Sequence, residues 1–278
     1  MTMKKMTVRD VLDMKSGAEK ITMLTAYDAS FARLLDQAGI DIVLVGDSLG
    51  MVALGYESTV PVTMDEMVHH ARAVKHGVNQ ALLVGDMPFL SYQVSREDAI
   101  VNAGRFMKEA GCDAVKLEGG LEVCDTVAAL VRAGIPVMGH IGLTPQTAGS
   151  LGGYKVQGKD AESARRILAE ARGLADAGAF AVVLECIPDK LAGAISKSVA
   201  IPTIGIGAGV ECDGQVLVTH DLLGMFEKFT PSFVKCYAKL APQIKDAISS
   251  YRDEVKNGLY PDAAHSFTMQ LDIDELLK

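Results

Sequence analysis

Eight short apolar runs recur along the chain, and within each run nearly every successive residue is apolar. They span residues 21–27, 42–47, 82–86, 114–118, 137–141, 181–187, 203–207 and 216–220. A strand with one exposed face alternates apolar and polar residues, whereas a parallel strand covered on both faces is apolar throughout. The runs therefore predict eight parallel strands.

Segments with helical periodicity lie between these runs, and four of them share one ending. An Ala-Gly pair stands shortly before an apolar run at Ala38-Gly39, Ala110-Gly111, Ala133-Gly134 and Ala177-Gly178. A glycine just past a helix closes the last turn in the left-handed conformation. The four recurrences indicate an αβ unit that is repeated at irregular spacing.

Capping residues mark where several helices begin. Thr63 and Glu66 form a capping box ahead of an apolar stripe that stops at Gly77. Ser95 opens a second helix and Asp160 a third. A further helix is expected near the N-terminus, ahead of the first strand.

Alternating helices and eight strands favour a (β/α)8 barrel, the TIM-barrel fold of the α/β class. The length of 278 residues suits this fold, which needs roughly 250. The stretch from Gly207 to Val216 is too short for a full crossover helix, so we expect an abbreviated seventh βα unit. A doubly wound open sheet is the competing fold.

The domain organisation is expected to be simple. No Pro- or Ser-rich linker divides the chain, which predicts a single domain over residues 1–278. The charged, irregular segment from about residue 250 to residue 278 is expected to be a C-terminal arm. Two long glycine-rich loops, residues 48–62 and 144–159, follow strands, and such loops are commonly functional.

Composition narrows the functional classes. Hydrophobic residues make up 49% of the chain and charged residues 22%, with a net charge of −8, as in ordinary globular proteins. No basic stripe favours nucleic acid, and no run of about 18 apolar residues predicts a membrane span. The N-terminus lacks a signal-peptide pattern, and the five cysteines contain no C-x-x-C pair. We therefore expect a cytoplasmic protein with reduced thiols.

Charged residues stand at the ends of three neighbouring predicted strands. They are Asp47, Asp86 and the pair Lys116 and Glu118. A single Asp after a strand usually caps a helix or turns a loop. Lys116 and Glu118 share a face because strand residues two apart point the same way. In a barrel these acids would converge at its mouth, and a hard divalent cation such as Mg²⁺ would relieve their repulsion.

Glu185 stands at the end of the sixth predicted strand, among Leu184, Cys186 and Ile187. A carboxylate that faces an apolar barrel interior suits a general base. The alternative is a buried ion pair with Lys116 or an arginine. Other polar strand ends are His140, and His220 with Asp221.

The motif Gly205-Ile-Gly207-Ala-Gly209 invites a dinucleotide-binding interpretation. It lacks the βαβ context and the acidic residue that would bind a ribose. Close backbone approach at the barrel rim explains these glycines better.

At these residues the sequence closely resembles the ketopantoate hydroxymethyltransferase family. The matching strings include LVGDSLGMVALGYESTVPVTMDEMVHH, GDMPFLSY, AVKLEGG, IPVMGHIGLTPQ, VVLECIP and IGIGAGVECDGQVLVTHDLLGM. The resemblance extends from about Thr7 to Leu240, and nothing is carried over to the last part of the chain.

The resemblance implies an enzyme of pantothenate and coenzyme A biosynthesis. It would bind Mg²⁺ and transfer a hydroxymethyl group from 5,10-methylenetetrahydrofolate to 3-methyl-2-oxobutanoate, which gives 2-dehydropantoate. It also implies a homo-oligomer, a decamer by analogy with the family.

The resemblance also assigns roles to six residues. Asp47 and Asp86 match metal-site aspartates that also meet the substrate, and Glu118 matches the third metal-site acid. Ser48 and Lys116 match keto-acid contacts, and Glu185 matches the proton acceptor. His140 matches a position near the pocket without a defined role.

Two other functions remain open at this point. One is a metal-dependent lyase or mutase of the phosphoenolpyruvate mutase type that acts on a 2-oxo acid, and dependence on folate would separate it from the transferase. The other is a keto-acid binding module without catalysis. The full set of acids, lysine and candidate base argues against that module.

Overall fold

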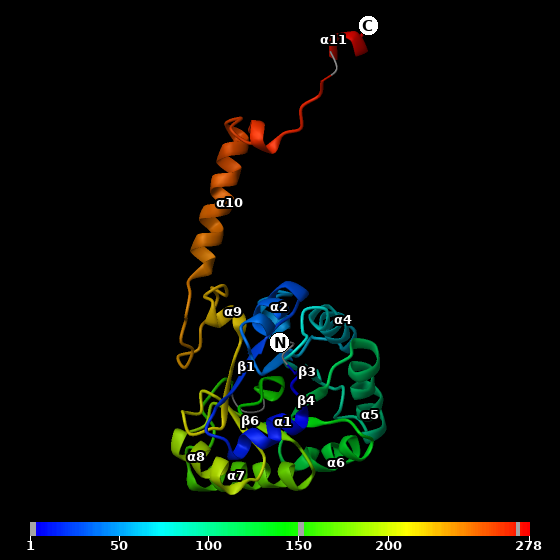
Figure 1. The fold of residues 1–278 in the computed structure, drawn as a ribbon. Helices are drawn as coiled ribbons and strands as arrows, with labels where there is room; N and C mark the ends of the chain where they lie inside the picture. Colours follow the sequence, from blue (N-terminus) through cyan, green and yellow to red (C-terminus); the bar gives the residue numbers. More distant parts are fainter. Residues whose placement is uncertain (1–3, 150–152, 271–272) are drawn as a thin grey trace. The chain divides into compact units, whose positions relative to one another are not determined.

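Eight parallel strands form a closed barrel, with helices outside it (Figure 1). The computed structural model describes residues 4–149, 153–270 and 273–278. The strands follow one another around the barrel in chain order: β1 Ile21–Thr25, β2 Ile42–Val45, β3 Leu82–Asp86, β4 Ala114–Glu118, β5 Val137–Gly142, β6 Ala181–Glu185, β7 Thr203–Ile206 and β8 Gly214–Leu217. The predicted barrel is confirmed, and the open-sheet alternative is wrong because β1 pairs with β8.

The helices pack around the barrel, most of them on its outer face, and the N-terminal helix places Val11 among the residues of the barrel interior. The helices are α1 Val8–Asp13, α2 Ala29–Gln37, α3 Leu49–Val52, α4 Met64–Lys75, α5 Arg96–Arg105, α6 Cys124–Arg132, α7 Ala161–Asp176 and α8 Asp189–Ser198. The expected N-terminal helix is α1. Thr63, Ser95 and Asp160 cap α4, α5 and α7 as predicted, and Thr63 completes a capping box with Glu66.

Two hydrophobic layers hold the barrel together. Side chains that point inward, such as Met23, Leu44 and Val183, fill its interior. The alternate residues, such as Val43 and Leu184, pack with the helices. Burial on both faces explains why the strand sequences are almost continuously apolar. The inward polar residues all lie toward the carboxyl ends of the strands.

The seventh unit is abbreviated, as predicted, because residues 207–213 join β7 to β8 without a helix. The predicted position of the last strand, 216–220, was displaced: β8 spans Gly214–Leu217, and His220 lies in the short helix α9 Thr219–Leu222. Thr219 donates its hydroxyl to the main-chain oxygen of Thr25 at 2.5 Å. This bond turns the chain away from the barrel wall at the end of β8.

The chain divides into two compact units. The first comprises Met1–His220 with Pro231–Val234, and the second comprises Asp221–Thr230 with Lys235–Lys278. The second unit contains α10 Leu240–Lys256 and α11 Ile273–Leu276. The predicted arm begins inside α10, and its role as an arm stays a prediction.

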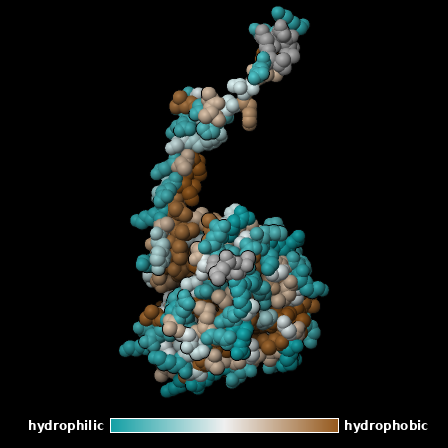
Figure 2. All heavy atoms as spheres, in the orientation of Figure 1, coloured by the Kyte–Doolittle hydropathy of each residue, from teal (hydrophilic) through white to brown (hydrophobic). Residues whose placement is uncertain are grey.

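One face of α10 is apolar yet open to solvent. Ile244, Ile248, Tyr251 and Val255 are between 42% and 62% exposed. Figure 2 shows hydrophobic residues running along this helix. Within the described ranges, no helix combines the length and the apolar character that a membrane crossing requires.

Candidate active site

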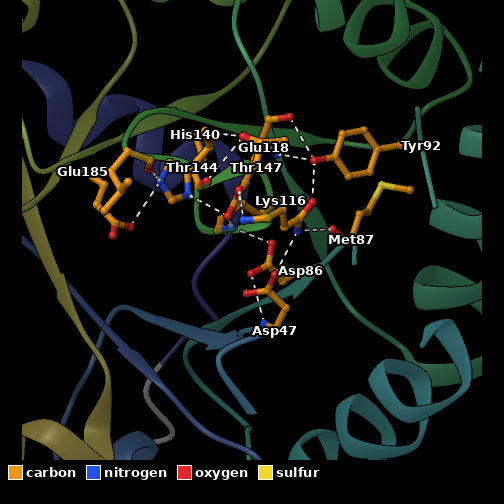
Figure 3. Close-up of polar contacts among 12 residues, drawn as sticks. Asp47, Asp86, Met87, Tyr92, Lys116, Glu118, His140, Thr144, Thr147 and Glu185 are labelled. Atoms are coloured by element: carbon orange, nitrogen blue, oxygen red, sulfur yellow. Dashed lines mark hydrogen bonds and ion pairs between the residues drawn. The ribbon is translucent and has the colours of Figure 1, made fainter. Parts of the chain in front are cut away.

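The barrel register places five polar side chains at one end of the barrel (Figure 3). Asp86 lies beside Lys116, Glu118 beside His140, and Glu185 beside Gly142 in neighbouring strands. Asp47 follows β2 directly, and all three predicted metal-site acids are at most 5% exposed. The structure thus brings predicted polar residues of five strands, β2 to β6, to one rim.

Lys116 is the cation of this rim. Its Nζ lies 2.6 Å from Oδ1 of Asp86 and 3.9 Å from Oε1 of Glu118. Burial alone would lower the pKa of Lys116, but the charges of Asp86 and Glu118 outweigh burial and raise it above its usual value. The ammonium therefore stays protonated and supplies a fixed positive charge.

The buried acids outnumber this cation. Burial, followed by the charge of Asp86, raises the pKa of Asp47 to about 7. Burial also raises the pKa of Glu118, although Lys116 opposes that shift. Three buried carboxylates beside one ammonium leave an excess of negative charge at the rim, and burial makes that charge unfavourable.

A divalent cation suits this excess of negative charge. Among the described residues, no three His, Cys, Asp or Glu side chains stand ready as a complete ligand set. Asp47 and Asp86 are adjacent, since the main-chain N–H of Asp47 donates to Oδ2 of Asp86 at 3.2 Å. Mg²⁺ commonly takes one or two carboxylates and completes its shell with water and substrate oxygens. The adjacent carboxylates of Asp47 and Asp86 are therefore a donor set that fits Mg²⁺.

His140 lies between Glu118 and Glu185 at the rim (Figure 3). Nε2 of His140 lies 2.9 Å from the main-chain oxygen of Leu143 and 3.3 Å from Oε2 of Glu185. Two acceptors require that Nε2 carry a proton. Nδ1 lies 3.7 Å from Oε1 of Glu118. Lys116 pairs with Asp86, so the ion pair considered for Glu185 is instead a contact with histidine.

Ser48 follows Asp47 at the start of α3. Its hydroxyl lies 2.9 Å from the hydroxyl of Tyr27, which comes from the end of β1. This contact fixes the side chain of Ser48 next to the acids. His220, which sequence analysis placed at a strand end, instead packs its ring near Tyr27 and Phe31.

Sequence reasoning missed two buried polar residues at this rim. Gln146 is 3% exposed and Tyr92 is 2% exposed. Tyr92 follows β3, and its hydroxyl lies 2.8 Å from Oε1 of Gln146. Gln146 belongs to a loop that was predicted to be functional, which was the one available signal.

A cavity of about 270 Å³ adjoins Glu118 and Tyr92. Its lining includes the polar residues Thr144, Arg166 and Glu170. The rim therefore offers space beside Glu118.

Solved structures with the same fold include phosphoenolpyruvate phosphomutase from Streptomyces platensis subsp. rosaceus. That chain has a TM-score of 0.62 at 15% identity, with 98% of this chain and 94% of the other covered. A complex of phosphonopyruvate hydrolase with oxalate and Mg++ has a TM-score of 0.61 at 12% identity, with 98% and 95% covered. Identities this low show a shared fold alone.

Sequence relatives are much closer. This chain is 61% identical to 3-methyl-2-oxobutanoate hydroxymethyltransferase of Desulfotalea psychrophila, over 98% of this chain and 97% of the relative. It is 59% identical to the protein of the same name from Carboxydothermus hydrogenoformans, over 98% and 99%. The family model described as Ketopantoate hydroxymethyltransferase matches residues 5–263. The chain therefore belongs to the ketopantoate hydroxymethyltransferase family.

Proposed function

We propose that this enzyme transfers a hydroxymethyl group from 5,10-methylenetetrahydrofolate to 3-methyl-2-oxobutanoate, giving 2-dehydropantoate and tetrahydrofolate on the route to pantothenate. One observation carries the proposal. In a chain 61% identical to a relative of that name, a buried lysine and three acids lie beside a Glu185–His140 pair. The first group suits binding of a charged keto acid, and the second suits proton removal.

Lys116 and Ser48 would bind the keto acid. The ammonium of Lys116 is already held by Asp86 at 2.6 Å, so it can stabilise negative charge without moving. Asp47 and Asp86 would hold Mg²⁺, with Glu118 reaching it through water. Mg²⁺ bound there would act as a Lewis acid toward the keto acid, an effect worth several kcal/mol.

Glu185 would take the proton from C3 of the keto acid. Its side chain is 14% exposed, and its Oε2 lies 3.3 Å from Nε2 of His140. That contact orients the carboxylate and leaves its second oxygen for the substrate. The electron pair released at C3 forms the new carbon–carbon bond to the methylene carbon, and both bonds from that carbon to the folate nitrogens break. Water supplies the hydroxyl oxygen of the product, and the folate nitrogens take up protons and leave as tetrahydrofolate. The cavity beside Glu118 would give room to part of the second substrate.

Replacement of Glu185 tests the role of the base. In the Glu185→Gln variant we expect exchange of the C3 proton in deuterated water, followed by NMR, to fall by about 100-fold or more, because general bases contribute roughly that factor. Binding of Mn²⁺ should persist, since Glu185 stands apart from Asp47 and Asp86. Glu162→Gln, on the exposed first turn of α7, is the matched control.

Two results would count against the proposal. Exchange at the wild-type rate in Glu185→Gln would remove Glu185 as the base. Turnover of a 2-oxo acid without folate would favour the lyase or mutase alternative, whose fold is shared by phosphoenolpyruvate phosphomutase.

The proposed enzyme works as a homo-oligomer in the cytoplasm. The exposed apolar face of α10 supports assembly, because such a face favours contact with another protein surface. All five cysteines of the described chain are free thiols, which is consistent with a reducing compartment. A decamer is the assembly expected from the family.

A further inference from the structure

Gln146 lies at the centre of the acidic rim, although it is neither charged nor part of a strand. It occupies the short 3-10 helix Pro145–Thr147 that follows β5. Its side chain reaches residues that follow β2 and β3, and its main chain reaches the last residue of β4. Gln146 thus makes hydrogen bonds with both Asp47 and Glu118.

The side-chain amide of Gln146 is fully engaged. Nε2 donates one hydrogen to Oδ2 of Asp47 at 2.9 Å and the other to the main-chain oxygen of Met87, also at 2.9 Å. The hydroxyl of Tyr92 lies 2.8 Å from Oε1 of Gln146 and 2.9 Å from the main-chain oxygen of Glu118, so its one proton is shared between these two acceptors. Rotating the amide by half a turn would bring its oxygen against two other acceptors. The network therefore permits one orientation of Gln146.

The main chain of Gln146 holds a second acid. Its N–H donates to Oε2 of Glu118 at 3.1 Å. The main-chain N–H of Glu118 in turn donates to the hydroxyl of Tyr92 at 3.1 Å. Tyr92 and Gln146 thus connect Asp47, which follows β2, with Glu118 at the end of β4 through hydrogen bonds.

From this geometry we infer that Gln146 is a positioning residue, held in place by Tyr92, that sets Asp47 and Glu118 for divalent cation binding. The inference rests on the proposed function, because it assigns the cation to these acids. A neutral donor suits the task, since it orients a carboxylate without cancelling the charge that the cation needs. Residues that orient metal ligands typically change metal affinity 10- to 100-fold when they are replaced.

Direct metal binding tests the inference without reference to turnover. The metal-free full-length protein is titrated with Mn²⁺, and free Mn²⁺ is followed by electron paramagnetic resonance. In Gln146→Met, which keeps the length of the side chain and loses the amide, we expect the dissociation constant for Mn²⁺ to rise about 10- to 100-fold. Tyr92→Phe removes the anchor at Oε1 and keeps both N–H bonds, so its increase should be smaller.

Gln157→Met is the matched control, because Gln157 lies in the same connection and its amide donates to the nearby main-chain oxygen of Lys155. Its Mn²⁺ affinity should equal that of the wild type. Circular dichroism melts verify that each variant folds. If Gln146→Met does not fold, Tyr92→Phe decides, and an unchanged dissociation constant there overturns the inference.

The outcomes separate this inference from the proposed function. Wild-type Mn²⁺ affinity in folded Gln146→Met overturns the role of Gln146 and leaves the transferase proposal intact. Weakened Mn²⁺ binding in Gln146→Met supports that role even if the wild type shows no folate-dependent turnover, a result that would overturn the transferase proposal instead.

Discussion

At the scale of single residues, the rim separates two kinds of carboxylate by their partners. Asp86 is paired with Lys116 at 2.6 Å, whereas Glu185 faces the imidazole of His140 at 3.3 Å. The first carboxylate is bound to a permanent cation. The second lies beside an imidazole, and its side chain is 14% exposed. The neighbouring side chain, rather than the type of acidic residue, distinguishes the carboxylate proposed for binding from the one proposed for proton transfer.

The buried carboxyl group of Asp221 allows a test of how burial changes stability with pH. It is 8% exposed, burial raises its pKa to about 6, and within the described ranges its Oδ1 has no hydrogen-bond partner. A raised pKa means that the folded state binds the proton more tightly than the unfolded state, so stability falls as pH rises from about 4 through 6. Asp221→Asn should therefore be more stable than wild type above pH 6.

Urea unfolding at pH 4 and pH 8 measures this effect. The stability gain of Asp221→Asn should be larger at pH 8 by on the order of 1–2 kcal/mol. Asp246→Asn, at an exposed position of α10, should show no such pH dependence. A gain equal at both pH values would contradict the burial argument.

The site residues that lie on strands could largely be predicted from the sequence, whereas those that lie in loops could not. Lys116 and Glu118 were expected on one face because the strand period is two, and both lie at the rim. Gln146 and Tyr92 escaped prediction because their positions depend on backbone turns that no local pattern reveals. Leu90, two residues before Tyr92, has a φ of 64°, a conformation that is rare for a side chain of this kind.

At the scale of elements, the apolar runs predicted the positions of seven strands closely. The predicted position of the eighth, residues 216–220, differs from the observed Gly214–Leu217. The β8 sequence, Gly-Gln-Val-Leu, alternates in burial and contains little apolar signal. A Cβ on Gly214 would lie 2.5 Å from the main-chain oxygen of Ile21. This strand is thus defined by close backbone approach to β1, which an analysis of hydrophobicity does not detect.

The capping box of α4 was predicted from the sequence, and its removal should lower the stability of the protein measurably. Thr63 Oγ1 accepts from the main-chain N–H of Glu66 at 3.2 Å, and Glu66 Oε2 accepts from the N–H of Thr63 at 2.7 Å. Thr63→Ala should lower the free energy of unfolding by about 1 kcal/mol. Thr63→Ser keeps the acceptor and should stay within a few tenths of wild type in urea unfolding. Equal loss in both variants would assign the effect to the methyl group.

At the scale of the whole molecule, the two units bury their apolar residues very differently. The first unit encloses two hydrophobic layers around its barrel. In α10 of the second unit, Ala241 is the buried residue, whereas Ile244, Ile248, Tyr251 and Val255 are exposed. Their spacing of four, three and four residues aligns them on one face of the helix. A seam of this kind normally packs against another protein surface.

This seam predicts assembly through α10. Ile248→Glu combined with Tyr251→Glu places two charges on the seam, and burying them unpaired in an interface is unfavourable. We expect the proposed homo-oligomer to dissociate more readily in this variant, which sedimentation velocity over a concentration series measures. Ser250→Glu adds the same kind of charge away from the seam and should leave the assembly unchanged. If the double variant sediments as wild type does, α10 is not an assembly surface, and the exposed seam must serve another purpose.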